Sequence, residues 1–415
     1  MTVGDDYDNE LEDSQESHVH RRGGLSRNLW RLAIVIGVAQ FSMSVWSWQF
    51  GIYMETLLEF WQMGLTFSIG TFASIIGFLS SGIISDLIGR KKTLLFAFLP
   101  MGLGMFLLVL FPIWPLFPLF YGVVHFGWSF VLITARAGPA DQIAQDKGKN
   151  AAKVFIMVLM PAFLMDGISP LFASLLLMTG FEAQFLLVIG GMFTVVSAIT
   201  AIAFFRETLA TEVKTKAREG PIIAFRGLGS NFWKLVCGTA GFSFAFNMAF
   251  PYLGNLIVNE WGIDDSIFGL AWGLSSISVA ILTLVLGGLA DKRVKRALIV
   301  AIIADSLIMF GFAIGGGILF LFVLNILWAI PIVVWIGAER ALIVEGVGDE
   351  MQGRALGTYQ VIMSSIGMVA QIVGSLIWTV TGSLRYLWLI ASVTGFIFIG
   401  VIILALRSIK LANEQ

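Results

Sequence analysis

The chain has 415 residues, of which 57% are hydrophobic and 13% charged, and its formal net charge is −1. A soluble domain carries roughly 25% charged residues, so this composition excludes an ordinary water-soluble protein. The near-zero net charge gives no reason to expect a nucleic-acid partner. No CxxC, HExxH or Walker A pattern occurs, so we expect no metal, no cofactor and no enzymatic activity.

The first segment, 1–28, is polar and predicts a disordered tail. Apolar runs that are long enough to cross a bilayer then recur almost to the C-terminus. Their predicted limits are 29–56, 64–85, 93–112, 115–136, 151–178, 183–205, 232–258, 266–288, 296–316, 318–338, 354–379 and 385–407. They predict an all-α polytopic membrane protein with twelve transmembrane helices.

The longest hydrophilic connection, 206–231, follows the sixth span. It divides the chain into an N-terminal six-helix bundle, 29–205, and a C-terminal six-helix bundle, 232–408, with a short tail at 409–415. Of the 26 basic residues, all except Arg385 fall in the tails or in loops on the same side as the tails. Because Lys and Arg accumulate on the cytoplasmic side, we expect both termini in the cytoplasm and the protein in the plasma membrane.

An internal repeat relates the two bundles. "GIISDLIGRKK" matches "GGLADKRVKRA", with Asp86 and Asp291 205 residues apart. "ARAGPADQIAQDKGKNAAKVF" matches "ERALIVEGVGDEMQGRALGTY", with Arg136 and Arg340 204 residues apart. Two features at nearly one offset predict parallel repeats, that is, two pseudo-symmetric halves related by an axis along the membrane normal.

These motifs resemble those of the major facilitator superfamily. "GIISDLIGRKK" resembles its loop 2–3 signature, G-x-x-x-D-[RK]-x-G-[RK]-[RK], with a departure at Leu87, and "GGLADKRVKR" resembles the second-half copy, with a departure at Val294. "ALIVEGVGDEMQGRALG" resembles the family's loop 10–11, with Gln352 in place of an arginine, and "FFRETLATE" resembles the segment that closes the sixth span. The resemblance implies a transporter fold in which spans three, six, nine and twelve lie outside a central cavity.

The resemblance also implies a cytoplasmic gate. Asp86 would face the N-terminus of span eleven, where the helix dipole attracts an acid, and Arg90 could pair with Asp141. In the second half Asp291 would face span five, and Lys295 could reach Glu345. Such pairs would favour an outward-open state, whereas the alternative is that the basic residues only fix topology. The predicted gating motif comprises Gly82, Asp86, Gly89, Arg90, Lys91, Asp141, Gly287, Asp291, Lys295, Arg296 and Glu345.

Polar and aromatic side chains recur at helical spacing in several spans and predict the wall of a substrate cavity. The candidates are Gln40, Trp48, Tyr121, Trp128, Asn247, Asn325, Trp328 and Gln371. For the tryptophans, simple packing is the alternative. We assign no Lys or Arg to the middle of a span, which argues against phosphorylated or dicarboxylate substrates. A small neutral, cationic or amphipathic organic solute is expected.

Two ionisable residues, Asp166 and His125, lie near the middle of their spans. A charged carboxylate there costs at least ~2.5 kcal/mol unless it is paired or hydrated, so together they could carry a proton. The alternatives are a hydrogen-bonded structural histidine and an acid that only joins helices. Asp305 is interpreted as structural.

The sequence therefore predicts a secondary active transporter that works by alternating access in the lipid bilayer, as a monomer, on a small-molecule substrate. Coupling to H⁺ is a hypothesis that rests on Asp166, and symport and antiport stay open. The alternatives are a facilitative uniporter without proton coupling and a non-transporting sensor or scaffold of the same fold.

Overall fold

The computed structural model of the chain describes residues 25–145, 151–207, 225, 227–286, 294–345, 347 and 351–409, except for the side chains of 140–145, 151–153, 155–156, 285–286 and 353. The helices of the N-terminal half are α2 (Arg27–Ser47), α3 (Phe50–Glu55), α4 (Phe60–Ile88), α5 (Arg90–Leu110), α6 (Leu116–Gln145), α7 (Ala151–Met178) and α8 (Ala183–Phe204). Those of the C-terminal half are α10 (Gly229–Ala249), η1 (Phe250–Tyr252), α11 (Leu253–Asn255), η2 (Leu256–Glu260), α12 (Asp265–Leu286), α13 (Val294–Ile314), α14 (Ile318–Glu345), α15 (Gln352–Thr381) and α16 (Leu384–Ser408).

The predicted number of spans is confirmed. Eleven of the described helices are long and apolar enough to cross a membrane. The twelfth span is α10 with the short helical turns that continue it to Glu260, and it is less apolar because it carries Lys234 and Asn247 within the membrane segment. The helical geometry changes at Phe250 and Pro251, as expected because proline lacks the backbone N–H of an α-helix.

Most predicted boundaries lie within four residues of the helix ends, and three predicted spans differ more clearly. The first span is not continuous, since α2 ends at Ser47 and α3 begins at Phe50. Helix α6 runs to Gln145 and α14 runs to Glu345, beyond their predicted ends at 136 and 338. These extensions place Arg136 and Arg340 within helices and not in loops.

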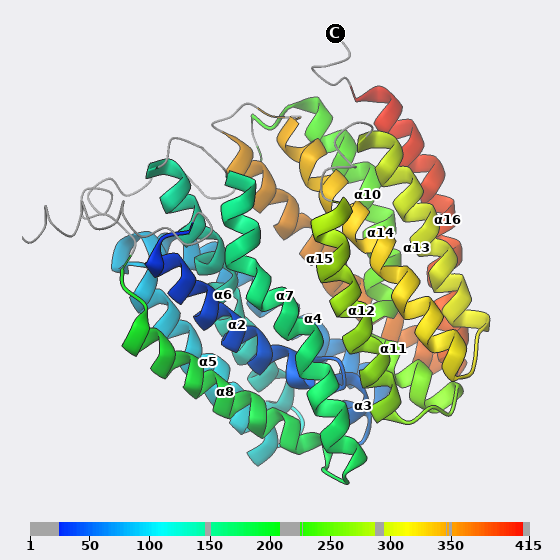
Figure 1. Ribbon diagram of the computed structural model, residues 1–415. Helices are drawn as coiled ribbons and strands as arrows, with labels where there is room; N and C mark the ends of the chain where they lie inside the picture. The colour runs from blue at the N-terminus through cyan, green and yellow to red at the C-terminus, as the bar shows by residue number, and fades with distance from the viewer. Residues whose placement is uncertain are drawn as a thin grey trace, which may run out of the picture.

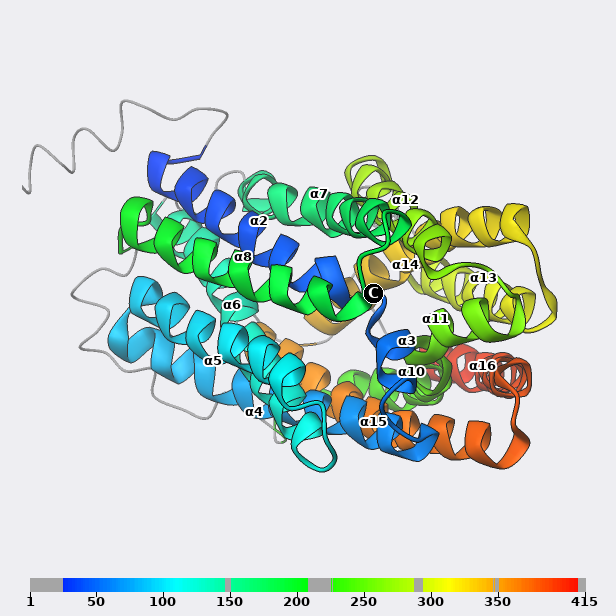
Figure 2. The same ribbon diagram turned by 90° about the horizontal axis from the view of Figure 1, so that it is seen from below.

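The helices form two bundles that stand side by side (Figure 1). The end of the molecule where described chain begins and ends, near Leu25 and Ile409, is called the termini end, and the opposite end, with α3 and η2, the closed end. The two bundles touch through α4 with α15 and through α7 with α12. At the closed end α3 and α11 lie together between the bundles (Figure 2).

The buried apolar residues divide in the same way. One cluster runs through the N-terminal half and continues across the closed end into residues between Met248 and Ala391 of the C-terminal half. The second cluster, between Leu228 and Ile409, stays within the C-terminal half. A shared core therefore joins the halves at the closed end.

Candidate transport pathway and gate

Repeat-equivalent residues meet each other at the closed end. Asn255 donates from Nδ2 to the Gly51 carbonyl oxygen at 3.0 Å and to Glu55 Oε2 at 2.7 Å. Asn259 donates from Nδ2 to both Glu55 carboxylate oxygens at 2.8 Å. Asn255 follows Gly51, and Asn259 follows Glu55, by 204 residues, the offset of the sequence repeat. These contacts therefore lie on the pseudo-symmetry axis and close this end.

The first seam between the halves runs along α4 and α15. Ser68 donates from Oγ to the Met368 carbonyl oxygen at 2.7 Å, and Thr71 donates from Oγ1 to Gln371 Oε1 at 3.1 Å. A Cβ atom on Gly64 would lie 2.0 Å from the Ser375 hydroxyl oxygen, so only glycine permits this approach. The helices are thus in close contact from the closed end to the level of Gln371.

The second seam, along α7 and α12, repeats this arrangement. The Ser276 side chain of α12 lies close enough to the Asp166 carboxylate of α7 to stabilise its charged form. Ser276 is 205 residues after Thr71, and Gln371 is 205 residues after Asp166. Each seam therefore joins one hydroxyl to one carboxyl or carboxamide group at equivalent positions. They differ in that only Asp166 can ionise.

Asp166 has further partners within its own half. Gln40 donates from Nε2 to Asp166 Oδ1 at 3.0 Å, and Ser44 donates from Oγ to the same oxygen at 2.5 Å. His125 is not among these partners. Its ring lies 4.3 Å from that of Tyr121, and its buried Nε2 atom has no hydrogen-bond partner among the described residues. The predicted cooperation of Asp166 with His125 is therefore not supported by a contact in this structure.

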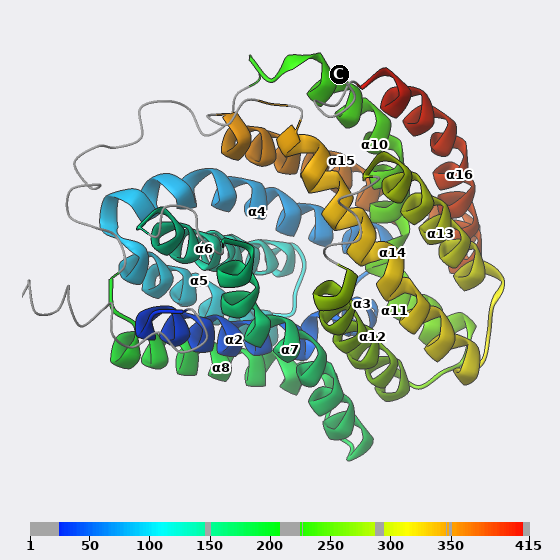
Figure 3. The ribbon, with the colours of Figure 1, turned by 45° about the horizontal axis from the view of Figure 1, so that its top comes forward.

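The halves stand apart toward the termini end. Figure 3, turned to bring this end forward, shows α6 and α14 facing each other, with the α4–α15 and α7–α12 pairs on either side. For pairs in which both partners are described, the hydrogen bonds between the halves lie between the closed end and the level of Asp166 and Gln371. The described contacts between the halves are therefore concentrated at the closed end and in the middle of the molecule.

The loop motif of the first half is held within that half. Arg90 donates from Nη1 to Asp86 Oδ1 at 2.7 Å and to the Ser85 hydroxyl at 2.8 Å. The Glu207 carboxylate accepts from the backbone N–H groups of Arg90 at 2.8 Å and Lys91 at 3.2 Å, where a helix N-terminus favours an acid. Lys91 also donates from Nζ to the Ile202 carbonyl oxygen at 2.9 Å.

Gly89 is required at this turn for two reasons. Its φ of +95° lies where L side chains are disfavoured, and a Cβ atom would lie 2.2 Å from Glu207 Oε2. Gly82 lies half-buried within α4. The motif therefore links α4, α5 and the segment after α8, and Glu207, which we did not predict as a site residue, could have been found in the "FFRETLATE" segment.

Of the predicted gate contacts between the halves, the one between Asp86 and span eleven is not seen among the described residues. Within the described chain, Asp86 bonds only to Arg90 and not to span eleven. Lys295 donates from Nζ to the Ile409 carbonyl oxygen at 2.8 Å, whereas the exposed Glu345 pairs with no described residue. The physical reason is that the halves are joined at the opposite end. Arg296 is exposed. Gly287, Asp291 and the side chain of Asp141 lie outside the described residues.

The structure places the cavity candidates in three environments. Gln40 and Gln371 belong to the seams, and Trp48 lies beside α12, with its ring 5.7 Å from Phe268. Half-buried Trp128 and Asn247 lie within their halves, and Asn247 donates from Nδ2 to the Ser243 carbonyl oxygen at 2.8 Å.

Three other candidates are buried. Tyr121 stacks on Phe50 with ring centroids 4.6 Å apart. Asn325 and Trp328 are 1% and 2% exposed, and the Trp328 indole N–H donates to the fully buried Asp305. The prediction that Asn325 and Trp328 line a cavity is therefore wrong for this structure, because their polar groups are used inside the C-terminal bundle. The interpretation of Asp305 as structural stays a prediction, and its burial and its bond to Trp328 agree with it.

A half-buried acid, Glu339, was missed because the tenth span was predicted to end before it. Glu339 of α14 accepts hydrogen bonds from the Trp335 indole N–H at 3.1 Å and from the Tyr359 hydroxyl. That hydroxyl also shares a hydrogen bond of 2.7 Å with Thr239 Oγ1. The cluster joins α10, α14 and α15. At the equivalent positions of the first half, 204 residues earlier, the residues of the described side chains are apolar: Val35, Val131 and Ala135.

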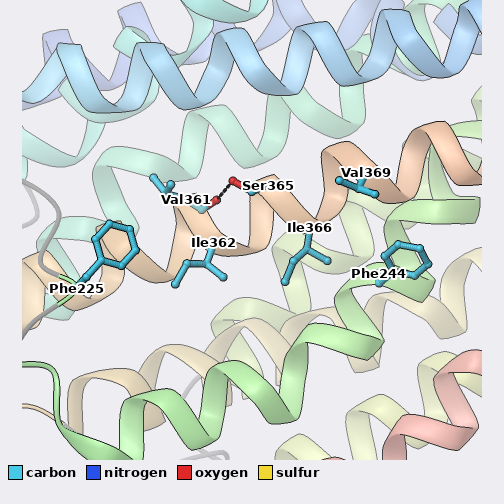
Figure 4. A pocket seen from close by; sticks show the side chains of 7 residues that line it. All are labelled: Phe225, Phe244, Val361, Ile362, Ser365, Ile366 and Val369. Atoms are coloured by element: carbon cyan, nitrogen blue, oxygen red, sulfur yellow. Dashed lines mark hydrogen bonds between the residues drawn. The ribbon is translucent and has the colours of Figure 1, made fainter.

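A groove of about 540 Å³ lies between α10 and α15 (Figure 4). Its lining residues are Phe225, Phe244, Val361, Ile362, Ser365, Ile366 and Val369. The one hydroxyl among them, that of Ser365, donates to the Val361 carbonyl oxygen at 2.8 Å. The lining therefore offers apolar surface and no polar group aimed at a polar solute.

Comparison with known proteins agrees with this architecture. The family model of the Major Facilitator Superfamily matches residues 32–371. The chain belongs to this superfamily. A search of curated proteins finds no match.

Solved structures of other superfamily members share the fold. The nucleoside transporter NupG is 14% identical, with a TM-score of 0.73 over 92% of this chain and 99% of that one. An inward-facing, occupied bacterial homologue of the human lysosomal transporter Spinster is 15% identical, with a TM-score of 0.70 over 92% and 96%. The human organic anion transporter MFSD10 is 13% identical, with a TM-score of 0.63 over 91% and 99%. At these identities the likeness concerns the fold of the superfamily alone.

Proposed function

We propose that this chain is a secondary active transporter that moves a small organic solute by alternating access between its two halves. This proposal rests on the repeated seam between the halves, in which a hydroxyl faces a carboxamide on one side and a carboxylate at the equivalent position on the other. Weak, repeated hydrogen bonds of this kind suit a contact that must form and break in each cycle. The gating motif around Asp86 and Arg90 then serves the opposite end, which closes in the other state.

Coupling to protons is assigned to Asp166. While the closed end is shut, Gln40 and Ser44 donate hydrogen bonds to it, and the Ser276 side chain of the other half lies close enough to stabilise its charge. Opening this end removes Ser276, so the carboxylate loses a donor in a segment where a bare charge is costly. Uptake of a proton offsets that loss, which links protonation to opening. The Gln371 side chain does not ionise, so we expect the other seam to open and close without taking up or releasing a proton.

The test is uptake by purified protein in liposomes, with a radiolabelled nucleoside and a radiolabelled organic anion as first solutes, after the neighbours of known structure. A proton gradient should change the rate of solute accumulation: an inward gradient accelerates it in symport, and an outward gradient accelerates it in antiport. Asp166→Asn should abolish this response and leave exchange of labelled for unlabelled solute in place. An unchanged gradient response in Asp166→Asn would refute the coupling role. Gln371→Glu, the matched change in the other seam, should introduce an additional pH dependence.

The alternatives give different results in the same assay. A facilitative uniporter would exchange solute and ignore the pH gradient in the wild-type protein. A sensor or scaffold would bind a ligand without uptake. We further propose a monomer in the plasma membrane with both termini in the cytoplasm. Protease cleavage of a C-terminal tag only after the membrane is permeabilised would support that orientation, and cleavage on intact cells would contradict it.

A further inference from the structure

Two arginines occupy equivalent positions in the two halves. Arg136 lies on α6 and Arg340 on α14, 204 residues apart. At 1.5 Å per residue, Arg136 lies about 13 Å before the C-terminal end of α6, and Arg340 lies about 8 Å before the C-terminal end of α14. Both are exposed. They therefore project from the helical part of the chain, on the two helices that face each other toward the termini end (Figure 3).

The two guanidinium groups are close enough to repel each other across the space between the halves. Neither forms a hydrogen bond or an ion pair with a described residue. Glu339, beside Arg340 in the chain, attracts it electrostatically, but its carboxylate is held by Trp335 and Tyr359 inside the C-terminal bundle. Two like charges that face each other without a described acid between them form an attractive site for an anion.

We propose that Arg136 and Arg340 together bind a small organic anion, through a carboxylate or phosphate group, as the solute that enters from the termini end. This inference rests on the proposed transport function and names its substrate class. The planar guanidinium fork matches the two oxygens of either group. It replaces the expectation of a neutral or cationic solute, which depended on assigning both arginines to loops.

The position of the pair also links binding to movement. Because α6 and α14 face each other across the pseudo-symmetry axis, shutting the termini end brings the two positive charges closer. Repulsion opposes that step when the site is empty, and a bound anion removes the opposition. Binding of the anion should therefore favour the state that is shut at the termini end.

The test measures thermal stability of the purified full-length protein with succinate and with inorganic phosphate, at constant ionic strength held by sodium chloride. At least one dianion should raise the melting temperature in a saturable manner. Arg136→Gln and Arg340→Gln should each weaken the apparent affinity about ten- to hundredfold, as expected for loss of one charged hydrogen-bonding group. Lys92→Gln, which removes one exposed positive charge from the same end, should leave the response unchanged.

Equal responses in wild type and both arginine variants would overturn the assignment. So would the absence of any rise in melting temperature with either dianion at roughly 50 mM, which is 50 times a dissociation constant of about 1 mM. Should a glutamine variant fail to fold, Arg136→Lys and Arg340→Lys keep the charge and lose the fork, and should still weaken binding. Nanodiscs with and without phosphatidylglycerol separate a lipid headgroup from a soluble anion. An arginine-dependent shift that only the anionic lipid produces would also overturn the proposal. If an anion raised the melting temperature through the two arginines but no uptake occurred, the binding site would be supported and the proposed transport function contradicted.

Discussion

The contact between Glu55 and the two asparagines of the other half should control how firmly the closed end is shut. Glu55→Ala removes both carboxylate oxygens that accept from Asn255 at 2.7 Å and from Asn259 at 2.8 Å. The half-buried bond to Asn255 contributes about 1.5 kcal/mol, the lower value for a hydrogen bond to a charged group. The exposed bonds to Asn259 add about 0.5 kcal/mol.

The total of about 2 kcal/mol corresponds to a change of about thirtyfold in the equilibrium between shut and open forms of this end. Asn255 keeps its bond to the Gly51 carbonyl oxygen at 3.0 Å, so the variant should still fold. The expected outcome is a marked increase in the fraction of molecules in which the two halves have separated at this end.

The assay places spin labels at Leu57 and Leu319, which are 38% and 79% exposed at the closed end on opposite halves, in a protein whose single cysteine is replaced by Cys237→Ser. Pulsed electron paramagnetic resonance then reports the distribution of distances between the labels. Glu59→Ala is the matched control, because Glu59 bonds to Trp61 and caps α4 within the first half. Identical distributions for Glu55→Ala and Glu59→Ala would refute the reasoning.

Three further predictions concern stability and are checked by thermal unfolding of the purified protein. Gly89→Ala should lower the unfolding free energy by about 2 kcal/mol, because φ is +95° there; an unchanged melting temperature would show that the turn relaxes freely. Trp328→Phe should cost about 1–3 kcal/mol by leaving the buried Asp305 without its donor, and adding Asp305→Leu should recover part of the loss, whereas additive losses would argue against the pair. Tyr359→Phe should cost about 1–3 kcal/mol when Glu339 is present and clearly less in a Glu339→Gln background; equal costs in both backgrounds would contradict a bond between them.

Symmetry and its exceptions carry much of this interpretation. The two halves share their seams, in which Thr71 pairs with Gln371 and Ser276 with Asp166. They differ at Asp166, which ionises where Gln371 cannot. An ionisable group therefore lies in one seam and not in the other, in a segment where an unpaired charge is costly, and the proposed proton coupling is built on this difference.

Part of the site was predictable and part was not. The stripe of polar residues singled out Gln40 and Gln371, which form hydrogen bonds between helices, to Asp166 and Thr71; their place in a substrate cavity stays a prediction. It failed for Asn325 and Trp328, because helical spacing gives the direction of a side chain and not what lies there. In this case Asp305 of α13 lies opposite Trp328 and accepts a hydrogen bond from the indole N–H, the one donor of that side chain.

The amino-acid sequence by itself determined the twelve spans, the division into two halves and their repeat, because apolar run length and motif spacing are local properties of the chain. Only the tertiary structure decided which partners those residues take. Asp86 bonds to Arg90 within its own half because the two halves are joined at the other end. Arg136 lies within electrostatic range of Arg340, on helices α6 and α14 that continue past the predicted boundaries. Partner choice depends on packing between segments that are about 200 residues apart, and a sequence pattern contains no measure of that distance.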